Sequence, residues 1–236
     1  MPPGDAIDPW RAIGRGFFSL TRAPFRLLLI LFLAISLVAE GQEAAVPLGQ
    51  SDLVIVVAFI AIQVYIQIAL VLAAGSNDPV RSTDAWLKSA WRRRCFWRFF
   101  IASILATLAV AVGAAILLVG AFVAGALVGL AQSAAALERA SPIEALFRSA
   151  NLSRRARVKV GIVFGLLILI PGAGVQAAAL LGLSERIGAQ WSVAVVVGEI
   201  ASAAGLIALT RMFVALGGTP SPPLDRMAPA PPARSA

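Results

Sequence analysis

The sequence has no histidine, only one cysteine and few charged residues. With no histidine and one thiol, the chain can form neither a disulfide scaffold nor a Cys/His zinc site. The usual acid–base residue of hydrolytic catalysis is missing as well. Charged residues make up 14% of the 236 residues and hydrophobic residues 59%. Soluble domains carry about 25% charged residues, so this composition predicts an integral membrane protein.

Long apolar runs cover most of the chain, at residues 27–39, 53–77, 99–137, 160–184 and 187–210. A helix needs about 20 apolar residues to cross a bilayer. As one helix, residues 99–137 would be about 58 Å long, nearly twice the hydrocarbon core. This run therefore predicts two helices with a turn between Gly113 and Gly120. The first run reaches span length if its helix begins near Ala23 and Arg26 snorkels to the surface.

The predicted fold class is an all-α integral membrane protein with six transmembrane helices. They form three consecutive hairpins joined by two cytoplasmic interfacial amphipathic helices. The predicted spans are residues 23–42, 53–74, 99–117, 120–137, 158–183 and 190–213. Residues 1–22 are expected to form a cytoplasmic N-terminal segment and residues 23–216 the membrane domain. Residues 217–236 contain six prolines and predict a disordered cytoplasmic tail.

Charge placement supports this topology. Cytoplasmic segments carry excess Lys and Arg, and six spans place 19 of the 20 cations inside, with only Arg186 outside. Five spans would put the basic segment 138–159 outside. We therefore expect a bacterial cytoplasmic membrane protein with both termini in the cytoplasm. A signal peptide over residues 1–40, leaving five spans, is the alternative.

Two similar segments, residues 84–90 and 144–150, share the order acid, Ala, two apolar residues, base, Ser, Ala. Each leads into an arginine cluster, which predicts short helices at the inner membrane surface. Ser141, Pro142 and Glu144 predict an N-cap, a first helical turn and a capping box. The similarity is either a true repeat or a convenient amphipathic turn used twice.

The basic segments supply the candidate surface for lipid or a protein partner. Tryptophans there are expected at headgroup depth, with the cations facing lipid phosphates. The candidates are Lys88, Arg92, Arg93, Arg94, Arg98, Arg148, Arg154, Arg155, Arg157, Trp86, Trp91 and Trp97.

Residues 141–154 read Ser-Pro-Ile-Glu-Ala-Leu-Phe-Arg-Ser-Ala-Asn-Leu-Ser-Arg. This stretch resembles the Ala-Leu-x-x-Ser-x-x-Leu signature of the glycerophosphoryl diester phosphodiesterase membrane-domain family. Leu169–Gly172 is also of a kind seen in that family. The chain departs from the family pattern at Arg155 and Ala156, where the family has Gly and aromatic residues. The resemblance implies a six-span bacterial membrane fold and no agreed activity.

Catalytic constellations are not found in the sequence. The acids are scattered singly, no phosphate-binding Gly-rich loop is present, and neither metal nor cofactor is expected. Cys95 lies among arginines, which would favour its thiolate, or it is an ordinary reduced thiol beside lipid. We predict that the chain is not an enzyme.

Glu199 falls within the sixth predicted span. An intramembrane carboxylate is costly unless it is paired, hydrated or protonated. Neutral partners on other spans are Gln63, Gln67, Gln132 and Gln176. The group either lines a proton or solute path or bonds to a Gln and holds helices together.

Small residues recur every fourth position at Ala121, Gly125 and Gly129 and again at Gly161 and Gly165. Such faces let helices approach closely, and internal packing explains them more simply than dimerisation. Together these features predict a structural or accessory membrane protein. Its basic cytoplasmic face would engage anionic lipid or a cytosolic partner, without nucleic acid. The alternative is a small transporter or channel with a polar path around Glu199.

Overall fold

The computed structural model describes residues 8–22, 24–43, 50–76, 82–116, 118–166 and 187–220, in which every regular element is a helix. The helices in chain order are α1 (Pro9–Leu20), α2 (Phe25–Glu43), α3 (Gln50–Ala74), α4 (Thr83–Arg92), α5 (Phe96–Ile116), α6 (Leu118–Val128), α7 (Ala131–Leu137), α8 (Pro142–Ser153) and α10 (Ile187–Ala215). A further helix covers residues 157–166.

Several of these helices are long and apolar enough to cross a membrane. Within the described residues there are four, over Val57–Ala74, Phe96–Ala115, Gly120–Leu137 and Val196–Ala215. A fifth is counted if α1 and the first part of α2, bent by 81°, form one span. The predicted all-helical membrane protein is confirmed at this level. Six spans stay a prediction, because residues 167–183 of the expected fifth span lie outside the described residues.

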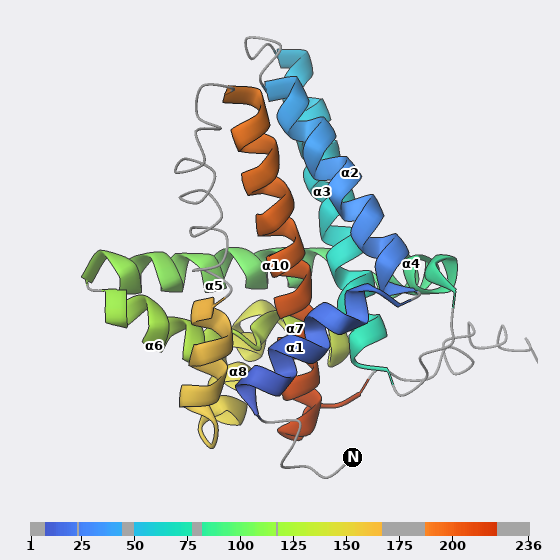
Figure 1. Cartoon of the computed structure of the whole chain (residues 1–236). Helices are drawn as coiled ribbons and strands as arrows, with labels where there is room; N and C mark the ends of the chain where they lie inside the picture. Colours follow the sequence, from blue (N-terminus) through green and yellow to red (C-terminus); the bar gives the residue numbers. More distant parts are fainter. Residues whose placement is uncertain are drawn as a thin grey trace, which may run out of the picture.

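The long helices run in two directions. Helices α2, α3 and α10 rise together, whereas α5 and α6 lie side by side and run across them (Figure 1). The backbones of α5 and α6 touch where Gly113 faces Gly120, since a Cβ on either would overlap the other's backbone. The outer face of α5 leaves Ile101, Ile104 and Leu108 exposed. Exposed residues of this size and spacing suit contact with lipid chains.

The core lies where the C-terminal half of α3 meets α7 and α10. Residues 68–72 of α3 are fully buried, whereas Val54 and Val57 in its N-terminal half are exposed. Large buried side chains from other helices, including Phe32, Phe99 and Phe213, join the same cluster.

The expected fourth span, residues 120–137, is interrupted. Helix α6 ends at Val128 and α7 begins at Ala131. Ser149 of α8 supplies the missing partners, because its Oγ donates to the carbonyl of Leu127 at 2.7 Å and accepts from the amide of Leu130 at 3.1 Å. Irregular backbone at membrane depth is tolerated where protein groups bond it. Residues 120–137 are thus still one candidate membrane span, as predicted, but the helix within it has a break after Val128.

Glycines let α6 pack closely on the helix over residues 157–166. The Phe164 ring occupies the space beside Gly125, and the Phe122 ring lies where a Cβ on Gly161 would come within 2.7 Å. The phenylalanine of each helix thus fills the notch left by a glycine of the other. Internal packing, the simpler of the two sequence explanations, is confirmed for these glycines.

Helix α1 was not anticipated within the N-terminal segment. Asp8 caps it, with a carboxylate oxygen accepting from the amide of Trp10 at 3.1 Å. Its buried residues include the small Ala12, Gly16 and Ser19, and the helix packs on α10.

We expect Gly16→Ala to destabilise the protein and Gly14→Ala to leave it unchanged or slightly more stable. A Cβ at residue 16 would lie 2.5 Å from the carbonyl oxygen of Ala204, whereas one at residue 14 meets nothing within 4 Å. Alanine normally favours a helix over glycine by about 0.5–1 kcal/mol, while overpacking costs about 1–3 kcal/mol. Thermal unfolding of both variants measures the difference. Equal stability would contradict the close packing of α1 on α10.

Candidate functional site

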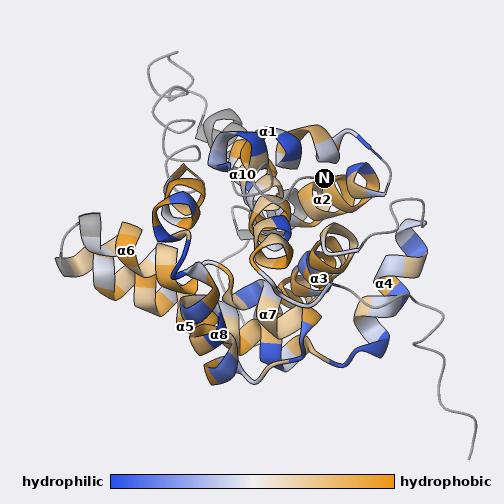
Figure 2. Cartoon of the chain, turned by 90° about the horizontal axis from the view of Figure 1, so that it is seen from below, coloured by the Kyte–Doolittle hydropathy of each residue, from blue (hydrophilic) through white to orange (hydrophobic). Residues whose placement is uncertain are grey.

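The strongest concentration of free cations follows α8. Arg154, Arg155, Arg157 and Lys159 are all exposed, and no carboxylate pairs with them in the described part of the chain. Hydrophilic residues lie on α1, α4 and α8 in the view from below (Figure 2). Arg92 and Arg94, between α4 and α5, are also exposed.

Large apolar side chains are exposed beside these cations. Helix α8 exposes Ile143 and Phe147, one turn apart, and Val158 lies between Arg157 and Lys159 with 68% of its surface exposed. Helix α1 exposes Trp10 and Phe18 in the same way. Exposed apolar residues with adjacent cations characterise helices that lie in a membrane interface.

Trp91 and Trp97 are two of the predicted interfacial residues, and they lie at the surface with 69% and 66% exposed. They belong to an aromatic cluster with Tyr65, Phe96 and Phe100, in which neighbouring ring centroids are 5.0–6.0 Å apart. Interfacial tryptophans of this kind anchor helices at headgroup depth.

Two candidates for the lipid-facing set prove to be internal. Trp86 is 1% exposed and Arg93 is 5% exposed, so neither faces lipid. The physical reason is helical periodicity, because Trp86, Ser89, Ala90 and Arg93 follow one another at the spacing of a single helix face. That face of α4 packs inward, and the sequence assignment of Trp86 and Arg93 is corrected.

Arg93 bonds the C-terminal end of α7. Its Nη1 donates to the carbonyl of Ala136 at 2.7 Å and to that of Leu137 at 3.2 Å. Carbonyls in a last helical turn lack intrahelical partners and carry partial negative charge. Burial, and then the charge of Arg139, lower the pKa of the Arg93 guanidinium, which nevertheless stays charged as arginines do.

Cys95 is buried beside Arg93. Burial raises the pKa of the Cys95 thiol, against the opposing effect of the nearby arginines. The thiolate that the neighbouring arginines suggested is therefore not favoured, in keeping with the ordinary reduced thiol.

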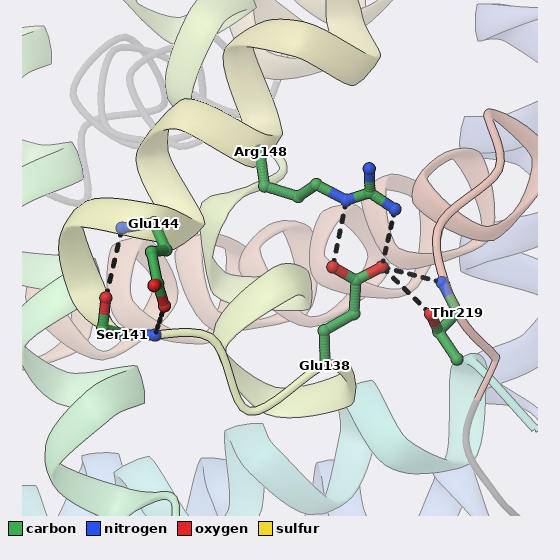
Figure 3. Close-up of polar contacts among 5 residues, drawn as sticks. All are labelled: Glu138, Ser141, Glu144, Arg148 and Thr219. Atoms are coloured by element: carbon green, nitrogen blue, oxygen red, sulfur yellow. Dashed lines mark hydrogen bonds and ion pairs between the residues drawn. The ribbon is translucent and has the colours of Figure 1, made fainter.

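Arg148 is held within the protein by Glu138 (Figure 3). Its Nε and Nη2 donate to the two carboxylate oxygens at 3.0 and 3.1 Å, and the amide and hydroxyl of Thr219 donate to Oε1 at 3.0 and 3.2 Å. Partial burial acts to raise the pKa of Glu138, but the bonds from Arg148 and Thr219 and the Arg148 charge hold it below its usual range. The pair ties the start of the C-terminal segment to α7 and α8. Residues 221–236 of the expected tail lie outside the described residues.

The predicted capping box at the start of α8 is confirmed (Figure 3). The amide of Ser141 donates to Glu144 Oε2 at 2.9 Å, and the amide of Glu144 donates to Ser141 Oγ at 3.4 Å. Two further basic candidates, Lys88 and Arg98, also contact other residues of the protein. Lys88 pairs with Asp84 at 2.7 Å on α4, and Arg98 donates to the carbonyl of Arg139.

Glu199 lies among polar side chains of α2 and α3. Ser36 Oγ donates to Glu199 Oε1 at 2.9 Å, and Gln63 Nε2 donates to the same oxygen at 3.2 Å. Gln63 was one of four partners suggested by the sequence, whereas nothing in the sequence distinguished Ser36. These bonds join three helices through one carboxylate, which is the geometry of a packing contact.

The other glutamines lie elsewhere. Gln67 and Gln132 line a cleft of about 350 Å³ between α3, α5, α7 and α10, and Gln132 Nε2 donates to Ser103 Oγ at 3.0 Å. Glu199 is not among the residues that line this cleft. Gln176 lies outside the described residues.

No group of three or more Cys, Asp or Glu that could hold a metal is present among the described residues. Comparison with known proteins gives no matching family model, no similar curated protein and no similar solved structure. The resemblance of residues 141–154 to the phosphodiesterase membrane-domain family therefore stays a prediction from the motif.

Proposed function

We propose that this chain is a non-enzymatic, multi-pass protein of a bacterial cytoplasmic membrane whose basic face binds anionic lipid headgroups. This face consists of the exposed cations Arg92, Arg94, Arg154, Arg155, Arg157 and Lys159. The six spans of the chain form three hairpins with both termini in the cytoplasm, and α4 and α8 lie at the inner membrane surface. The role is structural or accessory, and the same face is available to a cytosolic protein. The motif resemblance of residues 141–154 agrees with such a fold and adds no activity.

One observation carries this proposal. Arg154, Arg155, Arg157 and Lys159 stand exposed within six residues, without a carboxylate partner in the described part of the chain. Each cation near an anionic membrane surface contributes about 1 kcal/mol of attraction, which salt weakens. The exposed apolar side chains of Phe147 and Val158 beside them suit the apolar side of the same interface.

The transporter alternative has less support. A proton or solute path around Glu199 requires a hydrated carboxylate, and the contacts of Glu199 with Ser36 and Gln63 favour packing instead.

Lipid-dependent stability tests the proposal. We expect the unmodified protein to melt at a higher temperature in nanodiscs of anionic lipid than in zwitterionic nanodiscs, and the difference to shrink with salt. Replacing Arg92, Arg94, Arg154, Arg155 and Arg157 by Gln should remove the difference. Arg93 is left in place because it is buried in the fold.

The matched control replaces the same five arginines by Lys, which keeps the charge and should keep most of the lipid preference. Equal melting temperatures of the unmodified protein in both lipids would contradict lipid binding by this face.

A further inference from the structure

The cleft between α3, α5, α7 and α10 is distinct from the basic face and from the Glu199 contacts. Its volume of about 350 Å³ falls within the range of small-ligand pockets, about 300–1,000 Å³. Five polar side chains line it, and the rest of the lining is apolar or glycine. The polar ones are Gln67 from α3, Ser103 and Thr107 from α5, Gln132 from α7 and Ser202 from α10.

Two of the five polar side chains are already bonded to the protein. Gln132 donates to Ser103, and Ser103 Oγ donates onward to the carbonyl of Phe99 at 2.8 Å. This chain fixes the orientation of the Ser103 hydroxyl and of the Gln132 amide on one wall of the cleft.

The other three have no partner in the described part of the chain. Gln67, Thr107 and Ser202 make no hydrogen bond there, although all three belong to candidate membrane spans. A polar group at membrane depth costs free energy when it stays unbonded. Thr107 and Ser202 are exposed and Gln67 is partly buried, so these amide and hydroxyl groups are available to hydrogen-bond a ligand in the cleft.

The lining of the cleft also favours uncharged ligands over charged ones. None of its lining residues is ionisable, so a charged ligand would lose its hydration without gaining an ion pair. Thr107 and Ser202 line the cleft and are exposed, so a ligand can enter it from the surface of candidate membrane spans. We infer that the cleft binds an uncharged amphiphile, whose hydroxyl or carbonyl head bonds Gln67, Thr107 and Ser202 while its apolar body contacts Val110, Leu206 and Phe164.

Dodecanol and dodecane test this inference, because they differ only in the hydroxyl head. With the full chain in nanodiscs, saturable retention of radiolabelled dodecanol above that of empty nanodiscs is expected, and dodecane should show none. Gln67→Leu combined with Ser202→Ala should weaken dodecanol binding by about tenfold or more, since two head contacts are lost.

Leu108→Ala, on the outer face of α5, serves as the control and should bind dodecanol like the unmodified protein. Circular dichroism and melting of each variant show whether it is folded. If the double variant does not fold, the single variants Thr107→Val and Ser202→Ala replace it, each with a smaller expected loss. No saturable dodecanol binding, equal binding of dodecane, or undiminished binding by folded cleft variants would each overturn the inference, and would leave water as the occupant.

Discussion

Arg93→Met is expected to lower the free energy of unfolding by about 2–4 kcal/mol, one of the largest effects of any single substitution in this chain. Methionine fills much of the volume but leaves the carbonyls of Ala136 and Leu137 without the donor that now bonds both. An unbonded buried polar group costs about 1–3 kcal/mol. The substitution also removes the cost of desolvating the buried guanidinium, but this gain offsets only part of the loss. Unfolding in a denaturing detergent measures the change.

Arg92→Met is the matched control, since it removes the neighbouring cation from an exposed position. Surface substitutions usually change stability by less than about 0.5 kcal/mol. If Arg92→Met and Arg93→Met were equally harmless, Arg93 would not cap α7 and would belong to the exposed basic face after all.

Glu199→Leu should destabilise the protein by about 1–3 kcal/mol, while Glu199→Gln should cost little. Leucine removes the acceptor of the bonds from Ser36 and Gln63, and interhelical hydrogen bonds in membranes contribute about 0.6–2 kcal/mol each. Glutamine keeps a carbonyl oxygen at the same place, so it can accept from both donors.

Flux measurements in liposomes separate packing from transport at this residue. If Glu199 holds helices together, neither variant changes proton permeability. A pH-driven flux in the unmodified protein that is lost in a folded Glu199→Gln variant would contradict the packing role.

Composition and hydropathy predict the helical class and most of the long helices, because apolar runs of membrane length have few alternatives. Local chemistry predicts the capping box of Ser141 and Glu144, which depends on residues three apart. The glycine notches at Gly125 and Gly161 are also visible in the sequence, since small residues recur there every fourth position.

Contacts between distant segments are harder to predict. The break after Val128 depends on Ser149, and Ser36 meets Glu199 across 163 positions of sequence. The sequence around Ser36 and Ser149 does not identify their partners, and hydropathy does not predict that α5 and α6 run across α2, α3 and α10 (Figure 1).

The burial of Arg93 could have been predicted from the sequence. Trp86, Ser89, Ala90 and Arg93 have the i, i+3, i+4, i+7 spacing of one buried helix face. Because Arg92, Arg93 and Arg94 are adjacent in sequence, we expected all three to face lipid. A helix turns about 100° per residue, however, so the side chains of adjacent residues point in different directions. Arg92 and Arg94 are exposed on either side of it.

The basic face can bind one membrane surface only if its segments reach the same side of the bilayer. Impermeant maleimide labelling of Trp10→Cys, Arg92→Cys and Arg155→Cys, in sealed vesicles of known orientation, tests this directly. All three positions are exposed, and the native Cys95 is buried, so its background labelling should be low. Gln50→Cys, at the start of α3 and on the side that the charge pattern places outside, marks the opposite face. We expect the first three to react only from the cytoplasmic side and Gln50→Cys only from the other. Labelling of Arg92→Cys and Arg155→Cys from opposite sides would contradict a common lipid-binding face.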